Sequence, residues 1–375
     1  MKIAVNTRLL IRNRLEGIGW FTYESLSRIT RQHPEHEFYF IFDRKFDDEF
    51  VFSPNVHPIV LPPQARHPLL YYAWFEIALP LLLKRLKPDL FLSTDGYLPL
   101  KTKIRTVNVF HDLNFEHYPN DLPLTERSYY QHFFPKYAQK ADRIATVSEY
   151  SKKDIIQLYG IAASKIDVIY DGAGDFFQPV KEEIKSLVRQ KYAEGSEYFL
   201  FVGALHPRKN LINLFKAFER FKQMTSGKHK LLVVGEKKWW TQQIREAYEQ
   251  CANKKEIIFT GRLNSGELSQ VMASAFALTY VSYFEGFGIP IVEAFRCGVP
   301  VITSNVTSMP EIAGDAAFLV DPFNVESIAE AMAGLYSDPL LREDLVERGN
   351  RRKDLFTWEK TAERLWQTIE KTLNQ

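Results

Sequence analysis

The chain has 375 residues and only two cysteines, Cys251 and Cys297. Neither has cysteine or histidine neighbours at the spacing of a zinc site, and two cysteines cannot form a disulfide framework, which favours a reducing compartment. An excess of charge of one sign is lacking too, because 48 lysines and arginines stand against 46 acidic residues and leave a net charge of +2. Electrostatic capture of nucleic acid requires a larger positive excess. We therefore expect no nucleic-acid partner.

Long hydrophobic runs are lacking as well. The most apolar segment, Pro68 to Leu83, is interrupted by Glu76 and Pro80 and is shorter than the roughly 20 residues that span a bilayer. The short apolar run at 2–5 meets polar residues at once and does not resemble a targeting signal. We expect a cytoplasmic protein, either free or at the inner face of the membrane.

What is present is ordinary globular composition, with 45% hydrophobic and 25% charged residues. A chain of this length is expected to hold about two domains. Two blocks of alternating strand and helix patterns follow one another, which predicts parallel sheets covered by helices. The expected strands are 2–5, 37–42, 56–60, 90–93, 106–110, 143–147 and 166–169, then 198–202, 230–234, 257–259, 277–281, 299–303 and 317–320. The expected helices are 19–32, 151–158, 211–224, 242–253, 265–275, 291–297, 325–336 and 358–373.

A turn-rich stretch from Tyr170 to Asp175 separates the two blocks. It predicts a Rossmann-like domain at 1–172, a second at 173–357, and a C-terminal helical segment at 358–375 that can cross back to the first domain. The fold class is α/β, with two doubly wound domains facing each other across a cleft. Such sheets place ligands at the carboxyl ends of their strands, so the loops there are the candidate sites.

The strongest local signal is a glycine loop that follows the expected strand at 277–281. Gly286 and Gly288 allow close approach of the backbone to a ligand, and Pro290 suits the first turn of a helix. A helix N-terminus favours an anion such as phosphate. Glu285 and Glu293 flank the loop and suit hydroxyl recognition, although a glycine-rich turn with a solvated glutamate at either end is the simpler alternative.

Two further strand-end patterns carry candidate residues. The segment Gly203 to Asn210 places Arg208 and Lys209 after a strand and before a helix, where they could neutralise a diphosphate or form a solvated pair. His111 follows the strand at 106–110, and there the alternative to a functional role is a hydrogen-bonded structural imidazole.

A Gly-x-Gly pair, Gly17 and Gly19, precedes the first expected helix. A nicotinamide-dependent oxidoreductase would show Gly-x-Gly-x-x-Gly here, and the third glycine is replaced by Thr22. This departure argues against a dinucleotide-binding enzyme.

Taken together and in this order, these motifs resemble the retaining glycosyltransferases of family 4, which have the GT-B fold, and in particular their bacterial mannosyltransferase branch. The resemblance covers nearly the whole chain. Further matching segments are Ser148-Glu149-Tyr150-Ser151, Ile169-Tyr170-Asp171-Gly172, Gly261-Arg262-Leu263, Gly298-Val299-Pro300-Val301 and Met309-Pro310-Glu311. The chain departs from the family at Ala204, where many members have arginine, and at Asp171-Gly172, where Asn-Gly is usual.

The resemblance implies roles for individual residues. Arg208 and Lys209 would bind the donor diphosphate, Glu293 the ribose, and Glu285 the donor sugar, while His111 would face the transferred sugar. With Glu285 and His111, the two cations would form the catalytic group. The remaining substrate-binding residues would be Gly17, Gly19, Gly203, Leu263, Phe287, Gly288 and Ile289.

The implied reaction is transfer of a sugar from a nucleoside diphosphate donor to a hydroxyl of a glycan or lipid-linked acceptor, with retained configuration. The sequence has no Asp-x-Asp motif, so we expect no metal and no cofactor beyond the donor itself. GDP-mannose is the favoured donor and an envelope polysaccharide the favoured product. A UDP-sugar-dependent enzyme and a non-catalytic sugar-nucleotide-binding protein remain alternatives.

The segment 66–105 carries seven cations against three acids around an aromatic run at 69–75. Cations beside aromatic residues would suit peripheral contact with a membrane. A buried helix with a solvated end explains the same pattern, and the oligomeric state is left open.

Overall fold

The computed structural model describes residues 1–374. They divide into two compact units. The first unit comprises Met1–Gly172 together with the C-terminal helix α15 (Trp358–Leu373), and the second comprises Ala173–Thr357. The chain therefore enters the second unit after Gly172 and returns to the first at Trp358.

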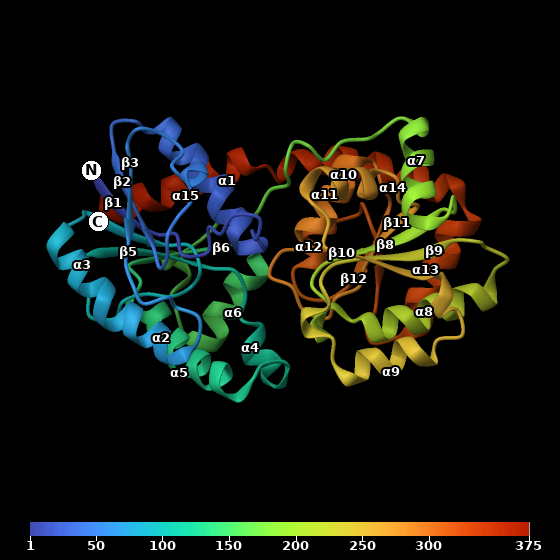
Figure 1. The fold of residues 1–375 in the computed structure, drawn as a ribbon, viewed down its shortest axis with the longest axis horizontal. Helices are drawn as coiled ribbons and strands as arrows, with labels where there is room; N and C mark the ends of the chain where they lie inside the picture. The colour runs from blue at the N-terminus through green and yellow to red at the C-terminus, as the bar shows by residue number, and fades with distance from the viewer. Residues whose placement is uncertain (375) are drawn as a thin grey trace. The chain divides into compact units, whose positions relative to one another are not determined.

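The first unit is built on a seven-stranded, all-parallel sheet (Figure 1). Its strands lie in the order β3-β2-β1-β4-β5-β6-β7. The chain starts in the middle of the sheet, winds outward to β3 and returns to β4, so the winding direction reverses between β1 and β4. The strands are β1 (Lys2–Asn6), β2 (Glu37–Phe42), β3 (Val56–Val60), β4 (Leu90–Ser93), β5 (Arg105–Phe110), β6 (Arg143–Thr146) and β7 (Ile166–Val168).

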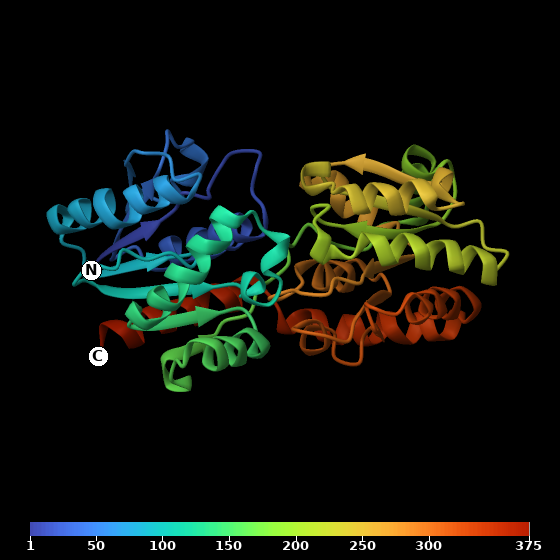
Figure 2. The same cartoon turned by 90° about the horizontal axis from the view of Figure 1, so that it is seen from below.

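Helices cover both faces of this sheet. One hydrophobic cluster includes Leu79, Phe134 and Ile155, which places α3, α5 and α6 on a common face. On the other face, α15 packs against α1 and strands β5 and β6 (Figure 2). The helices are α1 (Gly17–Gln32), α2 (Pro68–Ala73), a π-helical turn (Trp74–Ala78), α3 (Leu79–Leu86), α4 (Asn114–His117), α5 (Leu124–Lys140) and α6 (Glu149–Tyr159).

The second unit has a six-stranded parallel sheet in the order β10-β9-β8-β11-β12-β13, so the winding reverses between β8 and β11. Its strands are β8 (Tyr198–Val202), β9 (Lys230–Val234), β10 (Ile257–Gly261), β11 (Ala277–Tyr280), β12 (Val301–Ser304) and β13 (Phe318–Val320). Its helices are α7 (Glu182–Ala193), α8 (Leu211–Met224), α9 (Gln242–Gln250), α10 (Ser265–Ala273), α11 (Ile289–Cys297), α12 (Met309–Ala313), α13 (Val325–Ser337) and α14 (Pro339–Arg352).

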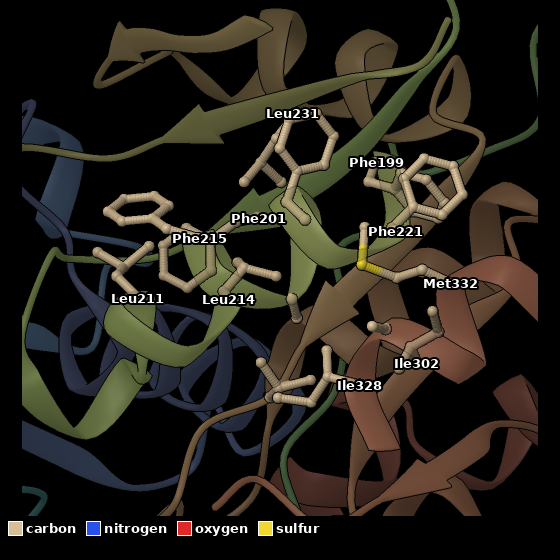
Figure 3. Close-up of a cluster of buried hydrophobic side chains, with 14 of the residues drawn as sticks. Phe199, Phe201, Leu211, Leu214, Phe215, Phe221, Leu231, Ile302, Ile328 and Met332 are labelled. Carbon is tan, nitrogen blue, oxygen red and sulfur yellow. The ribbon is translucent and has the colours of Figure 1, made fainter. Parts of the chain in front are cut away.

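Aromatic and aliphatic side chains fill the space between this sheet and helices α8 and α13 (Figure 3). Phe199 from β8 meets Phe221 from α8 edge-on, with ring centroids 5.1 Å apart. Met332 from α13 belongs to the same fully buried cluster. Burial of one such side chain contributes about 1.5–3 kcal/mol, so this core fixes the strand ends from which the adjoining loops leave.

The predicted fold class, two doubly wound α/β domains, is confirmed. The strands predicted from sequence all occur, with their ends shifted by up to two residues. Helices α7 and α14 were not expected, because each presents only two buried residues and its apolar stripe is too thin to recognise: Val188 and Ala193 in one, Leu345 and Gly349 in the other.

The predicted position of the Gly17–Gly19 segment is wrong. It forms the first turn of α1 and does not precede the helix as a loop. A Cβ at Gly19 would lie 3.2 Å from both the Leu9 carbonyl oxygen and the Leu15 side chain, so close packing explains this glycine. Within residues 1–374, no helix is long and apolar enough to cross a membrane.

The C-terminal helix is held to the first unit by aromatic and charged contacts. Trp366 stacks on His33 with centroids 3.7 Å apart and is almost completely buried. Trp358 contacts Phe21 edge-on at 6.5 Å. The Arg28 guanidinium lies 2.7 Å from the Glu359 carboxylate.

We expect Trp366→Ala to lower the free energy of unfolding of the first unit by about 3–5 kcal/mol, because a large buried ring is lost and a cavity remains. Chemical denaturation of the variant measures this loss. Glu370→Ala, at an exposed position of the same helix, is the matched control and should stay within roughly 0.5 kcal/mol of the wild type. Equal stability of both variants would mean that α15 is not anchored by its tryptophan.

Candidate functional site

The loops that follow β8 and β11 meet at the point where the second sheet reverses its winding. The two strands are neighbours in the sheet. The Tyr283 amide donates to the Arg208 carbonyl at 3.0 Å, and Arg208 Nη1 donates to the Phe284 carbonyl at 3.0 Å. Two segments about 75 residues apart in sequence therefore form one structure at the edge where doubly wound sheets bind ligands.

A buried charge cluster lies at this junction. Glu285 accepts from Arg208 Nη1 at 2.6 Å through Oε2 and lies 2.6 Å from Lys209 Nζ through Oε1. Burial alone would raise the pKa of Glu285, but the attraction of Arg208 and Lys209 outweighs it and lowers the pKa to about 2. Glu285 is therefore ionised at neutral pH, and the three side chains together carry a net charge of +1.

Tyr280, at the end of β11, completes the cluster. Its hydroxyl accepts a hydrogen bond from Lys209 Nζ at 2.6 Å, and the ammonium also lies 4.7 Å from the centre of the ring. Burial raises the pKa of Tyr280, and the neighbouring Glu285 raises it further, so the phenol stays protonated. Tyr280 was not predictable from the sequence, because an aromatic residue in a buried strand carries no local sign of a polar partner.

The backbone around the two cations is fixed by Asn210 and His206. Asn210 has φ 62°, and its amide group donates to the carbonyls of Val281 and Pro322 at 3.0 and 2.7 Å. His206 Nδ1 accepts from the Arg208 amide at 3.3 Å. These bonds tie the turn to the end of β11, so the orientation of the cations depends on the sheet.

Gly203, the first residue of this loop, is favoured by its backbone conformation. It has φ +147°, and a Cβ here would lie 3.4 Å from the Lys209 side chain. Its own carbonyl oxygen would lie only 1.9 Å from a Cβ at Gly235, so that position admits only glycine. The loops after β8 and β9 therefore pack backbone against backbone.

The glycine loop leads directly into α11. Gly288 has φ 105° and precedes the helix, which begins at Ile289 and carries Pro290 in its first turn. Ser308 Oγ donates to the carbonyls of Glu285 and Phe287 at 2.9 and 3.1 Å, which fixes the path of the loop. The predicted strand, glycine loop and helix start are present, and the N-terminus of α11 lies next to the cation cluster in sequence and in space.

Glu293 lies one turn inside α11 and is half-buried. Burial raises its pKa to about 8, so this carboxyl is mostly protonated at neutral pH. A protonated carboxyl can both donate and accept, as recognition of a hydroxyl pair requires. Leu263 lies in the loop after β10. The end of β10 is joined to the loop after β9 by the hydrogen bond from the Gly235 amide to the Gly261 carbonyl at 3.0 Å.

In the first unit, His111 follows β5, and its Nε2 lies 2.9 Å from the Thr94 carbonyl oxygen. A carbonyl only accepts, so Nε2 carries the proton and Nδ1 is left as an acceptor. Burial lowers the pKa of His111. Phe21 from α1 contacts the imidazole edge-on at 4.9 Å, which brings α1, whose first turn holds Gly17 and Gly19, to the side of His111.

A polar network missed by the sequence analysis orients this histidine. It lies where the first sheet reverses its winding, between β1 and β4. Arg8 Nε donates to Asp95 Oδ2 at 2.6 Å, Asn6 donates to Asp95 Oδ1 at 2.8 Å, and the Thr94 hydroxyl donates to the Asn6 carbonyl at 3.2 Å. The Thr94 carbonyl also accepts the hydrogen bond from His111 Nε2. The network therefore connects the point where the sheet reverses its winding to the imidazole. Arg8 and Asp95 are 87 positions apart in the sequence, so no local sequence pattern predicts that they pair.

Within residues 1–374, the one group of three side chains with metal-ligand atoms close together is His33, Glu35 and His36. It lies directly before β2, at the amino end of that strand, and does not belong to the strand-end loops described above. In those loops, cations and a helix start supply the means to bind an anion, and carboxyl groups supply the means to bind hydroxyls.

Comparison with known proteins agrees with this geometry. Residues 16–173 match the family model of Glycosyltransferase Family 4, and residues 183–352 match that of Glycosyl transferases group 1. The chain belongs to the glycosyltransferases of this type, and its two units are those of the GT-B fold.

Individual relatives are similar over most of their length. O-antigen chain mannosyltransferase B of Escherichia coli is 29% identical over 371 residues, which cover 96% of this chain and 97% of that protein. O-antigen chain mannosyltransferase RfbU of Salmonella typhimurium is 27% identical over 79% of this chain and 78% of its own. The crystal structure of Alr3699/HepE from Anabaena, in complex with UDP and glucose, has the same fold, with a TM-score of 0.74, 16% identity and coverage of 99% of this chain and 100% of that chain.

The two glutamates should give opposite pH dependences of stability. We expect Glu285→Gln to destabilise the second unit above about pH 4.5, where the wild-type carboxylate pairs with two cations, and the difference to shrink as the pH falls toward about 2. Glu293 has a raised pKa, so its contribution is complete below about pH 4.5 and is lost as the pH rises through about 8. Glu293→Gln should therefore gain stability relative to wild type over that interval.

Denaturant unfolding of both variants and the wild type between about pH 2 and pH 9 measures these differences. The two substitutions make the same chemical change, glutamate to glutamine, at positions eight residues apart, so each serves as the control for the other. Parallel pH profiles would contradict the assigned environments.

Proposed function

We propose that this protein is a retaining glycosyltransferase that moves mannose from GDP-mannose to a hydroxyl of a glycan or lipid-linked acceptor in the synthesis of an envelope polysaccharide. The observation that carries the proposal is the Arg208, Lys209 and Glu285 cluster beside the N-terminus of α11 at the switch point of the second sheet. The relative named O-antigen chain mannosyltransferase B, which matches along nearly its whole length, supports the sugar and the product class.

The donor diphosphate would bind to Arg208, Lys209 and the first turn of α11. When the bond to the sugar breaks, negative charge grows on the diphosphate, and preorganised cations and helix N–H groups stabilise it. Glu285 holds both cations in place and still leaves the cluster a net charge of +1. The two cations thus take the part that a divalent ion plays in other transferases, and we propose that the reaction needs no metal.

Retention of configuration follows in this proposal from attack on the same face of the sugar that the diphosphate leaves. The acceptor oxygen forms the new bond to the anomeric carbon while the bond to the diphosphate breaks, and the departing phosphate oxygen takes the acceptor proton. The protein then mainly orients reactants and stabilises charge. His111, neutral and with Nδ1 as an acceptor, would accept a hydrogen bond from a hydroxyl of the transferred sugar.

The remaining binding roles follow the shape of the donor. Glu293 would bind the ribose hydroxyls, and Gly203 and Leu263 would contact the donor through loops that admit close approach. Glu285 and the backbone from Phe287 to Ile289 would contact sugar and phosphate. Gly17 and Gly19 would present the first turn of α1 to the substrate.

A UDP-sugar donor is the second candidate, because the similar HepE structure contains UDP and glucose. A panel of GDP, UDP, ADP and their sugars, tested by thermal shift with and without EDTA, separates these candidates. We expect GDP and GDP-mannose to raise the melting temperature equally in both conditions, since binding to the native state alone stabilises it.

Lys209→Ala should remove this shift and lower kcat/KM by at least 100-fold, as loss of one preorganised donor typically does. The exposed Lys216→Ala, on α8, is the matched control. Unchanged turnover in Lys209→Ala would overturn the diphosphate assignment, and NMR of the product anomer tests retention.

The acceptor would reach the protein at a membrane surface. The helices between Pro68 and Leu86 bury one face in the core and expose Leu69, Tyr72, Ile77 and Leu81 on the other. Exposed Lys84, Arg85 and Lys87 follow at the end of α3. The segment contributes to the core, as the alternative of a buried helix expects, and we propose that its exposed apolar side chains beside the cations form the membrane contact.

We expect the combined variant Leu69→Ser, Ile77→Ser, Leu81→Ser to bind vesicles containing anionic lipid at least tenfold more weakly than wild type. Sedimentation with the vesicles measures this binding. The matched control replaces three exposed leucines of the second unit, Leu187, Leu340 and Leu355, by serine. Equal loss in both variants would show that the effect is not specific to this surface.

A further inference from the structure

The loop after β9 contains two adjacent tryptophans with different environments. Trp240 packs inward, with its ring centroid 5.4 Å from that of Phe259 and 6.2 Å from that of Tyr248. Trp239 is 37% exposed. A tryptophan normally buries its large apolar surface, so an exposed ring in an anchored loop calls for a partner.

The loop lies beside the proposed donor site. Strand β9 pairs with β8, so both strands end at the same edge of the sheet. The Leu205 amide donates to the Glu236 carbonyl at 3.3 Å, which joins this loop to the one that carries the cations. The Trp239 ring meets the His206 ring edge-on, with centroids 5.4 Å apart. Since His206 accepts from the Arg208 amide, a single side chain separates Trp239 from the residue proposed to bind the diphosphate.

The segment that carries Trp239 is anchored by residues on either side of it. Lys237 Nζ lies 4.8 Å from the centre of the Trp240 ring and 4.3 Å from that of Phe259, and the three residues Lys237–Trp239 form one helical turn. Lys238 Nζ lies 6.0 Å from the centre of the Trp239 ring. Lys237 and Trp240 thus anchor the segment on both sides of Trp239, whose own ring contacts that of His206.

We propose that Trp239 stacks on the base of the donor nucleotide. This inference rests on the proposed function and extends it, because it assigns a binding residue for the part of the donor that the cations do not reach. A nucleoside diphosphate runs from its phosphates through the ribose to a flat base, and an exposed indole near the phosphate-binding residues offers that base a flat apolar surface. Stacking depends on overlap area, so a purine such as guanine gains more than a pyrimidine.

Trp239→Ala should weaken GDP binding on the order of 5- to 150-fold, the range that loss of one base–aromatic stack produces. Trp239→Phe keeps a ring and should retain most of the affinity. Inorganic pyrophosphate, which has no base, should bind wild type and both variants equally. Isothermal titration with GDP and with pyrophosphate gives these values.

Kinetics and fluorescence provide independent readouts. A base stacked equally in the ground state and the transition state contributes uniform binding, so Trp239→Ala should raise KM for the donor and leave kcat unchanged. GDP should quench tryptophan fluorescence in wild type and in the control Trp20→Phe, whose ring belongs to the first unit, but not in Trp239→Phe.

The outcomes separate this inference from the function on which it rests. If wild type binds none of the nucleotides, the proposed function fails. If wild type binds GDP and Trp239→Ala binds it equally well, or loses pyrophosphate affinity to the same extent as GDP affinity, the stacking role is overturned. Preferential loss of GDP affinity, with unchanged pyrophosphate binding, supports it.

Discussion

The second unit depends on one electrostatic constraint, a carboxylate buried between two cations. Removing Glu285 from water is costly, and only the close approach of Arg208 and Lys209 makes its ionised form favourable. The cations in turn are held in a turn whose backbone is bonded to the end of β11. Charge, loop conformation and sheet topology are therefore coupled, because the cluster forms only where β8 and β11 lie side by side.

The first unit also has buried polar side chains at the point where its sheet reverses its winding, but they are different residues. There the switch point between β1 and β4 holds the Arg8 and Asp95 pair, and the carbonyl of Thr94 fixes the tautomer of His111. Both sheets thus place polar side chains at the one position where the loops of neighbouring strands diverge. A family of enzymes that changes its substrates while it keeps its fold can do so by altering these loops alone.

The parts of this structure that were predictable have local causes. Buried strands show as runs of apolar residues, and the start of α11 shows in Gly288 and Pro290, which satisfy backbone requirements that few other residues meet. The pairs that depend on strand order, such as Arg8 with Asp95 or Lys209 with Tyr280, were not predictable, since nothing near either partner in sequence specifies the other. The first turn of α1 was misjudged because Gly19 serves helix packing and not a free loop.

The return of the chain to the first unit has a consequence for synthesis on the ribosome. Residues 173–357 are continuous, so the second unit can fold as soon as they emerge. The first unit cannot bury the face of its sheet under β5 and β6 until α15 has been made. The strands of the first unit are synthesised early and therefore keep apolar surface exposed until the whole of the second unit has been translated. During that interval the nascent chain is most accessible to chaperones and most prone to aggregation.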